Sequence, residues 1–332
     1  MTEEHPFAQY VRILGKGPNL SRPLTIEEMY QAASLIMKDQ VEPMQIGAFL
    51  CILRMRTEVP EEGAGFVRAV RDTLTLPKKM PEVDVDWSSY SGKKRQLPWF
   101  LLAAQLLASN DVSIFMQGTE GHTAGRIYSH AALVSLGIPI AKSLQEAAEQ
   151  IRDSNFTFLP LAHLSPKLQE LIDFKSILGL RSPINTFGRM INPFSATHEI
   201  QTVFHPNYRD VHRDTAKLLG QKHMAVFKGE GGEVERRPQK PVLVQSLHNG
   251  ILSEEEWPAL LPEDSIKIDE SMNINRLKTV WSGEEKDTYA TAAITGTVAI
   301  VLRLIGRAKS PLDATEMAKK MWATRDTSRI ET

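Results

Sequence analysis

Three consecutive cations, Lys93, Lys94 and Arg95, follow a turn at Ser91 and Gly92 and precede the apolar run "LPWFLLAAQLLA". This order is typical of a junction that runs from a strand through a loop into a helix. Backbone N–H groups at such a junction can bind phosphate. Because the start of a helix already carries positive partial charge, three added cations favour an anion there. The alternative is a charged turn that only faces solvent.

Overall composition limits the classes of function. The chain has 332 residues, of which 42% are hydrophobic and 24% charged, as expected of a globular protein. Its net charge of −1 means that binding to nucleic acid would require a local basic patch. The single cysteine, Cys51, excludes an internal disulfide and indicates a reducing compartment. With no signal-like N-terminus and no apolar run of about 18 residues, we expect a cytoplasmic protein without a membrane span.

The elements that must position the cations change in character along the chain. Residues 5–75 read as helices only, and Thr25 and Glu28 have the spacing of a capping box. From about residue 82 the pattern predicts strands at 82–87, 112–118, 156–160, 223–229 and 241–247, with helical stretches between several of them. This alternation predicts an α + α/β protein, with a small all-helical domain and a larger α/β domain containing a mixed or parallel sheet.

The segment 156–193, "FTFLPLAHLSPKLQELIDFKSILGLRSPINTFGRMINP", resembles the middle of the anthranilate phosphoribosyltransferase family, which is glycosyltransferase family 3. The matching positions are Pro160, His163, Leu178, Gly179, Arg181, Asn185, Gly188, Asn192 and Pro193. The resemblance implies a nucleoside phosphorylase/phosphoribosyltransferase-like fold and a homodimer formed through the helical domains. It also implies a helical domain of residues 1–75, completed by about 165–185, and an α/β domain of residues 80–164 and 186–332.

The family's catalytic motifs are altered here. Its Gly-Thr-Gly-Gly-Asp loop, which wraps a pyrophosphate, falls on 88–92, where four of five residues carry side chains. Its Lys-His-Gly-Asn-Arg motif falls on 116–120 and keeps only Gly118. Of the magnesium-binding Asp-Glu pair only Glu233 remains, a weak candidate metal ligand that Glu230 or Glu235 could supplement. Lys175 replaces the arginine expected to meet the anthranilate carboxylate, which loses bidentate geometry. The resemblance therefore implies a protein without the family's activity.

The segment "SYSGKKRQ", residues 89–96, is similar to a loop of a divergent branch of nucleic-acid-binding members of the family. That similarity implies binding of single-stranded DNA or RNA without sequence preference through a basic cleft, and no cofactor. The predicted phosphate-binding residues are Ser91, Gly92, Lys93, Lys94, Arg95, Gln96, Lys175, Arg181 and Arg189. Additional candidates are Tyr90, which could stack on a base, and Gly118, Arg126, His163 and Asn185.

Two other functions remain open at this point. One is an active glycosyl- or phosphoribosyltransferase that uses Mg²⁺, phosphoribosyl pyrophosphate and an unknown acceptor. The other is a dimer that binds a small anion in a regulatory role. Neither alternative requires a membrane.

Overall fold

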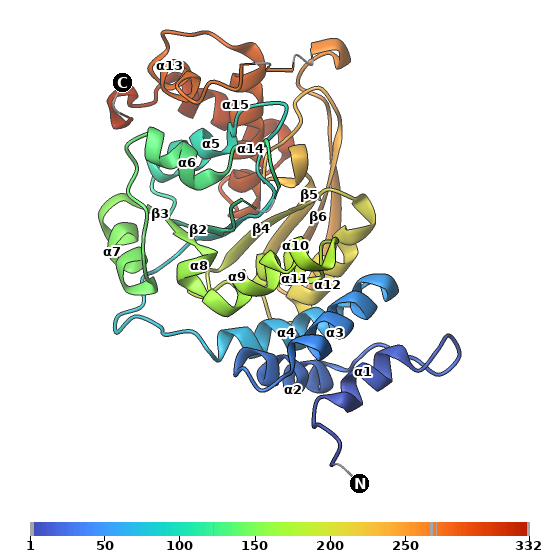
Figure 1. Cartoon of the computed structure of the whole chain (residues 1–332). Helices are drawn as coiled ribbons and strands as arrows, with labels where there is room; N and C mark the ends of the chain where they lie inside the picture. Colours follow the sequence, from blue (N-terminus) through green and yellow to red (C-terminus); the bar gives the residue numbers. More distant parts are fainter. Residues whose placement is uncertain (1–2, 122, 266–267, 270, 331–332) are drawn as a thin grey trace.

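The computed structural model describes residues 3–121, 123–265, 268–269 and 271–330 (Figure 1). The first four helices are α1 (Ala8–Gly15), α2 (Ile26–Met37), α3 (Pro43–Arg56) and α4 (Pro60–Arg71). Thr25 caps α2 together with Glu28, which confirms the predicted capping box. These helices form a layer at one end of the molecule, below the sheet in Figure 1.

A seven-stranded mixed sheet forms the centre of the larger domain, with strand order β3-β2-β1-β4-β5-β6-β7. The strands from β3 to β5 run parallel, and β6 and β7 are antiparallel additions at one side. The strand bounds are β1 (Val85–Ser89), β2 (Ile114–Gly118), β3 (Phe156–Pro160), β4 (His198–Val203), β5 (His223–Lys228), β6 (Val242–His248) and β7 (Ile251–Trp257). The predicted fold class is confirmed.

Two strands were not predicted. β4 lies in the middle of the sheet but carries two buried polar residues, Glu199 and Gln201, which are hydrogen-bonded to each other. Its sequence therefore lacks a continuous apolar run. β7 is an edge strand with mostly exposed side chains, including Glu254 and Glu256. Buried strands with polar networks and exposed edge strands both give weak sequence patterns.

Helices cover both faces of the sheet. The helices from β1 to β3 are α5 (Phe100–Ala108), α6 (Ser129–Ser135) and α7 (Leu144–Ser154). Between β3 and β5 lie α8 (Leu161–Leu164), α9 (Pro166–Asp173), α10 (Lys175–Leu178), α11 (Ile184–Phe187) and α12 (Arg209–Leu218). The last three are α13 (Arg276–Ser282), α14 (Thr288–Leu304) and α15 (Pro311–Ala323). None of the helices in the described ranges is long and apolar enough to cross a membrane.

Two large hydrophobic clusters hold these layers together. One joins the sheet to α5, α14 and α15, and every residue of α5 is buried. The other joins α1–α4 to apolar side chains of α9 and α11, among them Leu168, Leu171 and Phe187. The segment after β3 therefore packs with the helical layer. The loops at the carboxyl ends of the parallel strands lie at this junction, where ligands of α/β folds usually bind.

Candidate functional site

The loop after β1 binds a carboxylate of its own chain. The backbone N–H groups of Ser91 and Gly92 both donate to Glu233 Oε1, each at 2.6 Å. Gly92 has a φ of 64°, a conformation that favours glycine. Consecutive N–H groups pointing to one acceptor form an anion site. A glutamate side chain thus occupies the place where this loop could hold phosphate.

The next residue of the loop, Lys93, is buried and paired. Its Nζ lies 2.5 Å from Glu235 Oε1, and the lysine side chain is only 1% exposed. Glu235 Oε2 accepts from the N–H of Phe100, at the start of α5. Burial raises the pKa of Glu235 to about 7, and the attraction of Lys93 opposes that rise. The prediction that Lys93 contacts phosphate is wrong, because a buried carboxylate already neutralises it.

Two further predicted contacts are buried. Tyr90 is buried, and its hydroxyl lies 2.5 Å from Gln117 Oε1 and 2.8 Å from the Gly188 carbonyl. Burial also raises its pKa. Tyr90 is therefore not available to stack on a base, and that prediction is wrong. Gln96 is likewise buried, whereas Lys94 and Arg95 are exposed.

Three more cations lie beside this loop, and we call Arg126, Lys175 and Arg181 the cationic cluster. Arg126 Nη1 donates to the carbonyls of Ser91 and Gly92 at 2.8 and 3.1 Å. Lys175 Nζ and Arg181 Nη2 each lie 3.2 Å from Thr123 Oγ1. Burial, and then the neighbouring cations, lower the pKa values of Lys175 and Arg181. The cluster is thus a region of strong positive potential that favours an anion.

The remaining predicted residues have varied environments. Arg189 is buried behind the loop, with Nη2 2.8 Å from Ser91 Oγ. Asn185 is half-buried at α11, and His163 is exposed on α8. A side chain at Gly118 would place its Cβ 1.8 Å from the Ser89 carbonyl oxygen, so packing against β1 explains this glycine. The structure therefore brings Ser91, Gly92, Arg126, Lys175, Arg181 and Arg189 together.

Arg54 and the pairing of Glu235 with Lys93 were missed from the sequence. Glu235 follows Glu233 by two residues, and this spacing was the available signal. Arg54, in the last turn of α3, donates to the Tyr208 hydroxyl at 2.8 Å and adds charge to the same cleft. Nothing in the pattern of α3 separates Arg54 from an ordinary helix-end cation.

Comparison with known proteins explains this arrangement of domains. Residues 8–74 match the helical bundle domain of a glycosyl transferase family, and residues 100–324 match its a/b domain. The two matches cover most of the chain. The chain belongs to glycosyl transferase family 3.

Relatives in this family span nearly the whole chain. An uncharacterised protein of Aquifex aeolicus is 26% identical over 313 residues, covering 92% of this chain and 94% of that protein. An anthranilate phosphoribosyltransferase of Pyrococcus furiosus is 26% identical and covers 94% and 95%. The crystal structure of anthranilate phosphoribosyltransferase from Thermus thermophilus has a TM-score of 0.79 at 20% identity, covering 97% and 95%. This likeness establishes the fold.

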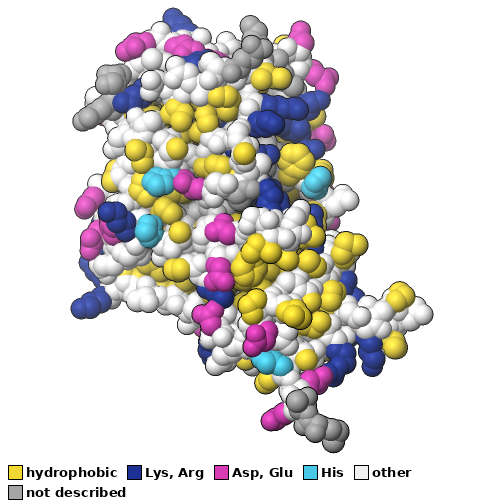
Figure 2. Space-filling model, in the orientation of Figure 1, with side chains coloured by type: hydrophobic (Ala, Val, Ile, Leu, Met, Phe, Trp, Pro, Cys, Tyr) yellow, Lys and Arg dark blue, Asp and Glu magenta, His cyan; other side chains and the backbone are white. Residues whose placement is uncertain are grey.

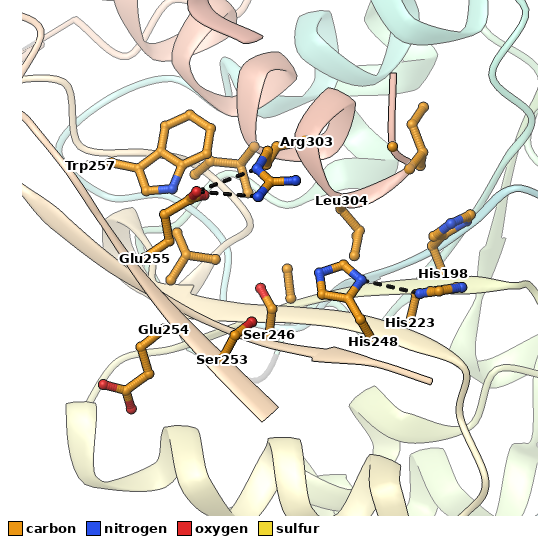
Figure 3. Close-up of a pocket in the computed structure, with 15 residues that line it drawn as sticks. His198, His223, Ser246, His248, Ser253, Glu254, Glu255, Trp257, Arg303 and Leu304 are labelled. Atoms are coloured by element: carbon orange, nitrogen blue, oxygen red, sulfur yellow. Dashed lines mark hydrogen bonds and ion pairs between the residues drawn. The ribbon is translucent and has the colours of Figure 1, made fainter. Parts of the chain in front are cut away.

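A polar cavity lies at the amino ends of β4 and β5, at the other end of the strands from the loop after β1 (Figure 3). His198, His223 and His248 form a row there across β4, β5 and β6, and the Nδ1 atoms of His223 and His248 are 3.2 Å apart. Burial is the largest cause that lowers the pKa of each histidine. In the part of the chain that the structure describes, no group of three or more His, Cys, Asp or Glu could hold a metal ion.

Proposed function

We propose that the protein binds single-stranded DNA or RNA without sequence specificity and does not transfer phosphoribosyl groups to anthranilate. The convergence of Arg126, Lys175 and Arg181 beside the loop after β1 carries the first half of this proposal. The pKa values of Lys175 and Arg181 are lowered partly by other cations, so an added anion would relieve unfavourable charge. Lys94 and Arg95, further along the same loop, are exposed to solvent.

The geometry of the cations suits a long polyanion. The isolated bridge between Lys93 and Ile127 places the segment with Lys94 and Arg95 beside the segment with Arg126. Figure 2 shows Lys and Arg side chains gathered near the upper right of the visible face. Phosphate contacts from such a surface give affinity without reading bases. The net charge of −1 makes this binding depend on a local patch.

The proposed loss of transferase activity rests on the loop after β1. Transfer from a pyrophosphate substrate depends on positioning and on neutralising charge. Here Glu233 accepts from the loop amides, and Glu235 neutralises Lys93. A pyrophosphate entering this loop would have to displace one carboxylate and would meet the other nearby. Sequence identity does not decide between loss and retention of this activity. The Pyrococcus furiosus anthranilate phosphoribosyltransferase and the uncharacterised Aquifex protein are both 26% identical to this chain.

Replacement of Lys94 and Arg95 by alanine should weaken binding to every single-stranded sequence about equally. Log affinity falls as log salt rises, and each lost phosphate contact makes this decline less steep by about 0.7. Loss of both contacts should therefore flatten the slope by about 1.4 per protomer. Fluorescence anisotropy with labelled oligonucleotides at several salt concentrations measures both effects. The matched control is Lys78→Ala/Lys79→Ala, which changes an exposed lysine pair in the segment between α4 and β1. If both double variants give the same slope, Lys94 and Arg95 do not contact phosphates, and the loop is only a solvated turn.

No turnover is expected with anthranilate, phosphoribosyl pyrophosphate and Mg²⁺, because the loop amides are occupied by Glu233. A fluorescence assay for loss of anthranilate measures this. Turnover at rates ordinary for enzymes would support the active-transferase alternative instead. An acceptor other than anthranilate is tested in parallel by following release of pyrophosphate.

We also propose that the protein is a homodimer formed through the helical layer. Met44 and Met55 on α3 are 85% and 81% exposed, and large exposed apolar side chains on one element favour an interface. Light scattering at micromolar concentration should give twice the chain mass. A monomer mass there, or a dimer that survives Met44→Lys/Met55→Lys, would contradict association through this face.

A further inference from the structure

A small cavity lies between α3, α11 and the start of α12, directly behind Ser91. Its volume is about 160 Å³, which suits one phosphate-sized group. Arg54, Arg181 and Arg189 line it together with Ser182 and His212. No Asp or Glu is among the described residues that line it. The cavity is therefore cationic, and it adjoins the loop after β1 through Ser91.

Two polar groups of this cavity lack partners among the described residues. Arg189 is 8% exposed and Ser182 is 6% exposed, yet Arg189 Nη1 and Ser182 Oγ make no hydrogen bond. Burial is the main cause that lowers the pKa of Arg189, while Glu233 and Tyr90 oppose this shift. A buried charged donor without an acceptor is costly, and native proteins rarely retain one unless a ligand or ion satisfies it. An oxyanion in the cavity would supply the missing acceptors.

His212 adds an acceptor to this set of donors. Its Nδ1 is 2.7 Å from Gln201 Oε1, and Gln201 Nε2 donates to Glu199. Because Gln201 Oε1 can only accept, Nδ1 carries the proton and Nε2 has a free lone pair. Burial, and then Arg189, lower the pKa of His212 to about 3, so the ring is neutral at pH 7. The cavity thus combines cationic donors with one neutral acceptor.

We propose that this cavity binds a phosphomonoester group, the phosphate at the end of a strand or on a small free molecule. A phosphomonoester approaches two negative charges at pH 7, because its second pKa is near 6, and it suits three arginines better than the single charge of an internal phosphodiester. Its monoanionic form also has a hydroxyl that can donate to His212 Nε2, whereas an internal phosphodiester has none. The strand-end form of this inference rests on the proposed function. It predicts a preference for phosphorylated ends over hydroxyl ends.

The test compares oligonucleotides of one sequence with a 5′-phosphate, a 3′-phosphate or hydroxyl ends, and adds a nucleoside monophosphate as the small source. At least one phosphorylated end should bind about tenfold more tightly than the hydroxyl form, the value of one charge-assisted contact. Arg189→Met should abolish this preference, and Ser182→Ala should reduce it. Arg152→Met, an exposed arginine on α7, is the matched control and should keep the preference.

The outcomes separate this inference from the proposed function. Equal affinity for all ends, with a steep salt dependence, overturns the phosphomonoester site and leaves nucleic-acid binding intact. Binding of the nucleoside monophosphate that Arg189→Met abolishes, without binding of any oligonucleotide, supports the site and rejects the nucleic-acid function. If Arg189→Met fails to fold, Ser182→Ala decides, and an unchanged preference in that variant overturns the inference.

Discussion

Replacement of Lys93 by methionine is expected to lower the free energy of unfolding by about 3–5 kcal/mol, the usual cost of removing one partner from a buried ion pair. Lys93 and Glu235 are both almost fully buried, and their charged atoms are 2.5 Å apart. Without Lys93 the carboxylate of Glu235 stays in a site with low water access. Its pKa, already about 7, should rise further. Urea denaturation followed by circular dichroism measures the change.

Two further variants test this account of Lys93. Lys93→Met/Glu235→Gln removes both charges and should recover much of the lost stability, because no uncompensated charge remains. Lys94→Met changes the exposed neighbour and should leave stability nearly unchanged. If Lys93→Met proves as mild as Lys94→Met, the buried pair is not as the structure describes it.

Replacement of Glu199 by glutamine should stabilise the protein increasingly as pH rises. Glu199 on β4 lies opposite Asp86 on β1 in the sheet register, and both are buried. Burial raises the pKa of Glu199 to about 7, against the attraction of Arg71, and raises that of Asp86 well above its usual value. A carboxyl with a raised folded-state pKa stabilises the protein at low pH, and this contribution is lost as pH rises from about 4.5 to 7.

The measurement is the difference in unfolding free energy between Glu199→Gln and the unchanged protein across this pH range. That difference should increase by on the order of 3 kcal/mol between pH 4.5 and 7. Burial lowers the pKa values of His198 and His212, so they destabilise the protein as pH falls below 6.5, opposite to the effect of Glu199. Both proteins contain these histidines, and the difference between them removes this contribution. Asp86→Asn should change the difference in the same direction. A difference independent of pH would mean that folding does not raise the pKa of Glu199.

Much of the fold follows from local sequence patterns. The capping box at Thr25, the apolar run of α5 and the alternation of strands and helices were enough to predict two layers of different character. β4 escaped prediction because Glu199 and Gln201 are buried by hydrogen bonding and not by apolar character. β7 escaped because an edge strand needs no apolar face.

The candidate site was less predictable, for a physical reason. Three adjacent cations look equivalent in a sequence, yet Lys93 is buried while Lys94 and Arg95 are exposed. The partner that makes the difference, Glu235, lies 142 residues further along the chain. The same holds for Glu233, which fills the loop only because the end of β5 lies close to the end of β1 in the folded sheet.

The glutamates of β7 restrict which surfaces of this protein can associate. An edge strand offers unpaired backbone groups to any extended segment that approaches. On β7 such a segment would meet Glu254 and Glu256 on one face of the sheet and Glu255, which is paired with Arg303, on the other. A second copy pairing there would bring like charges together across the new sheet boundary. The same charges repel the phosphates of a nucleic acid. This edge of the sheet is therefore poorly suited to pair with another copy of the chain or to contact phosphates.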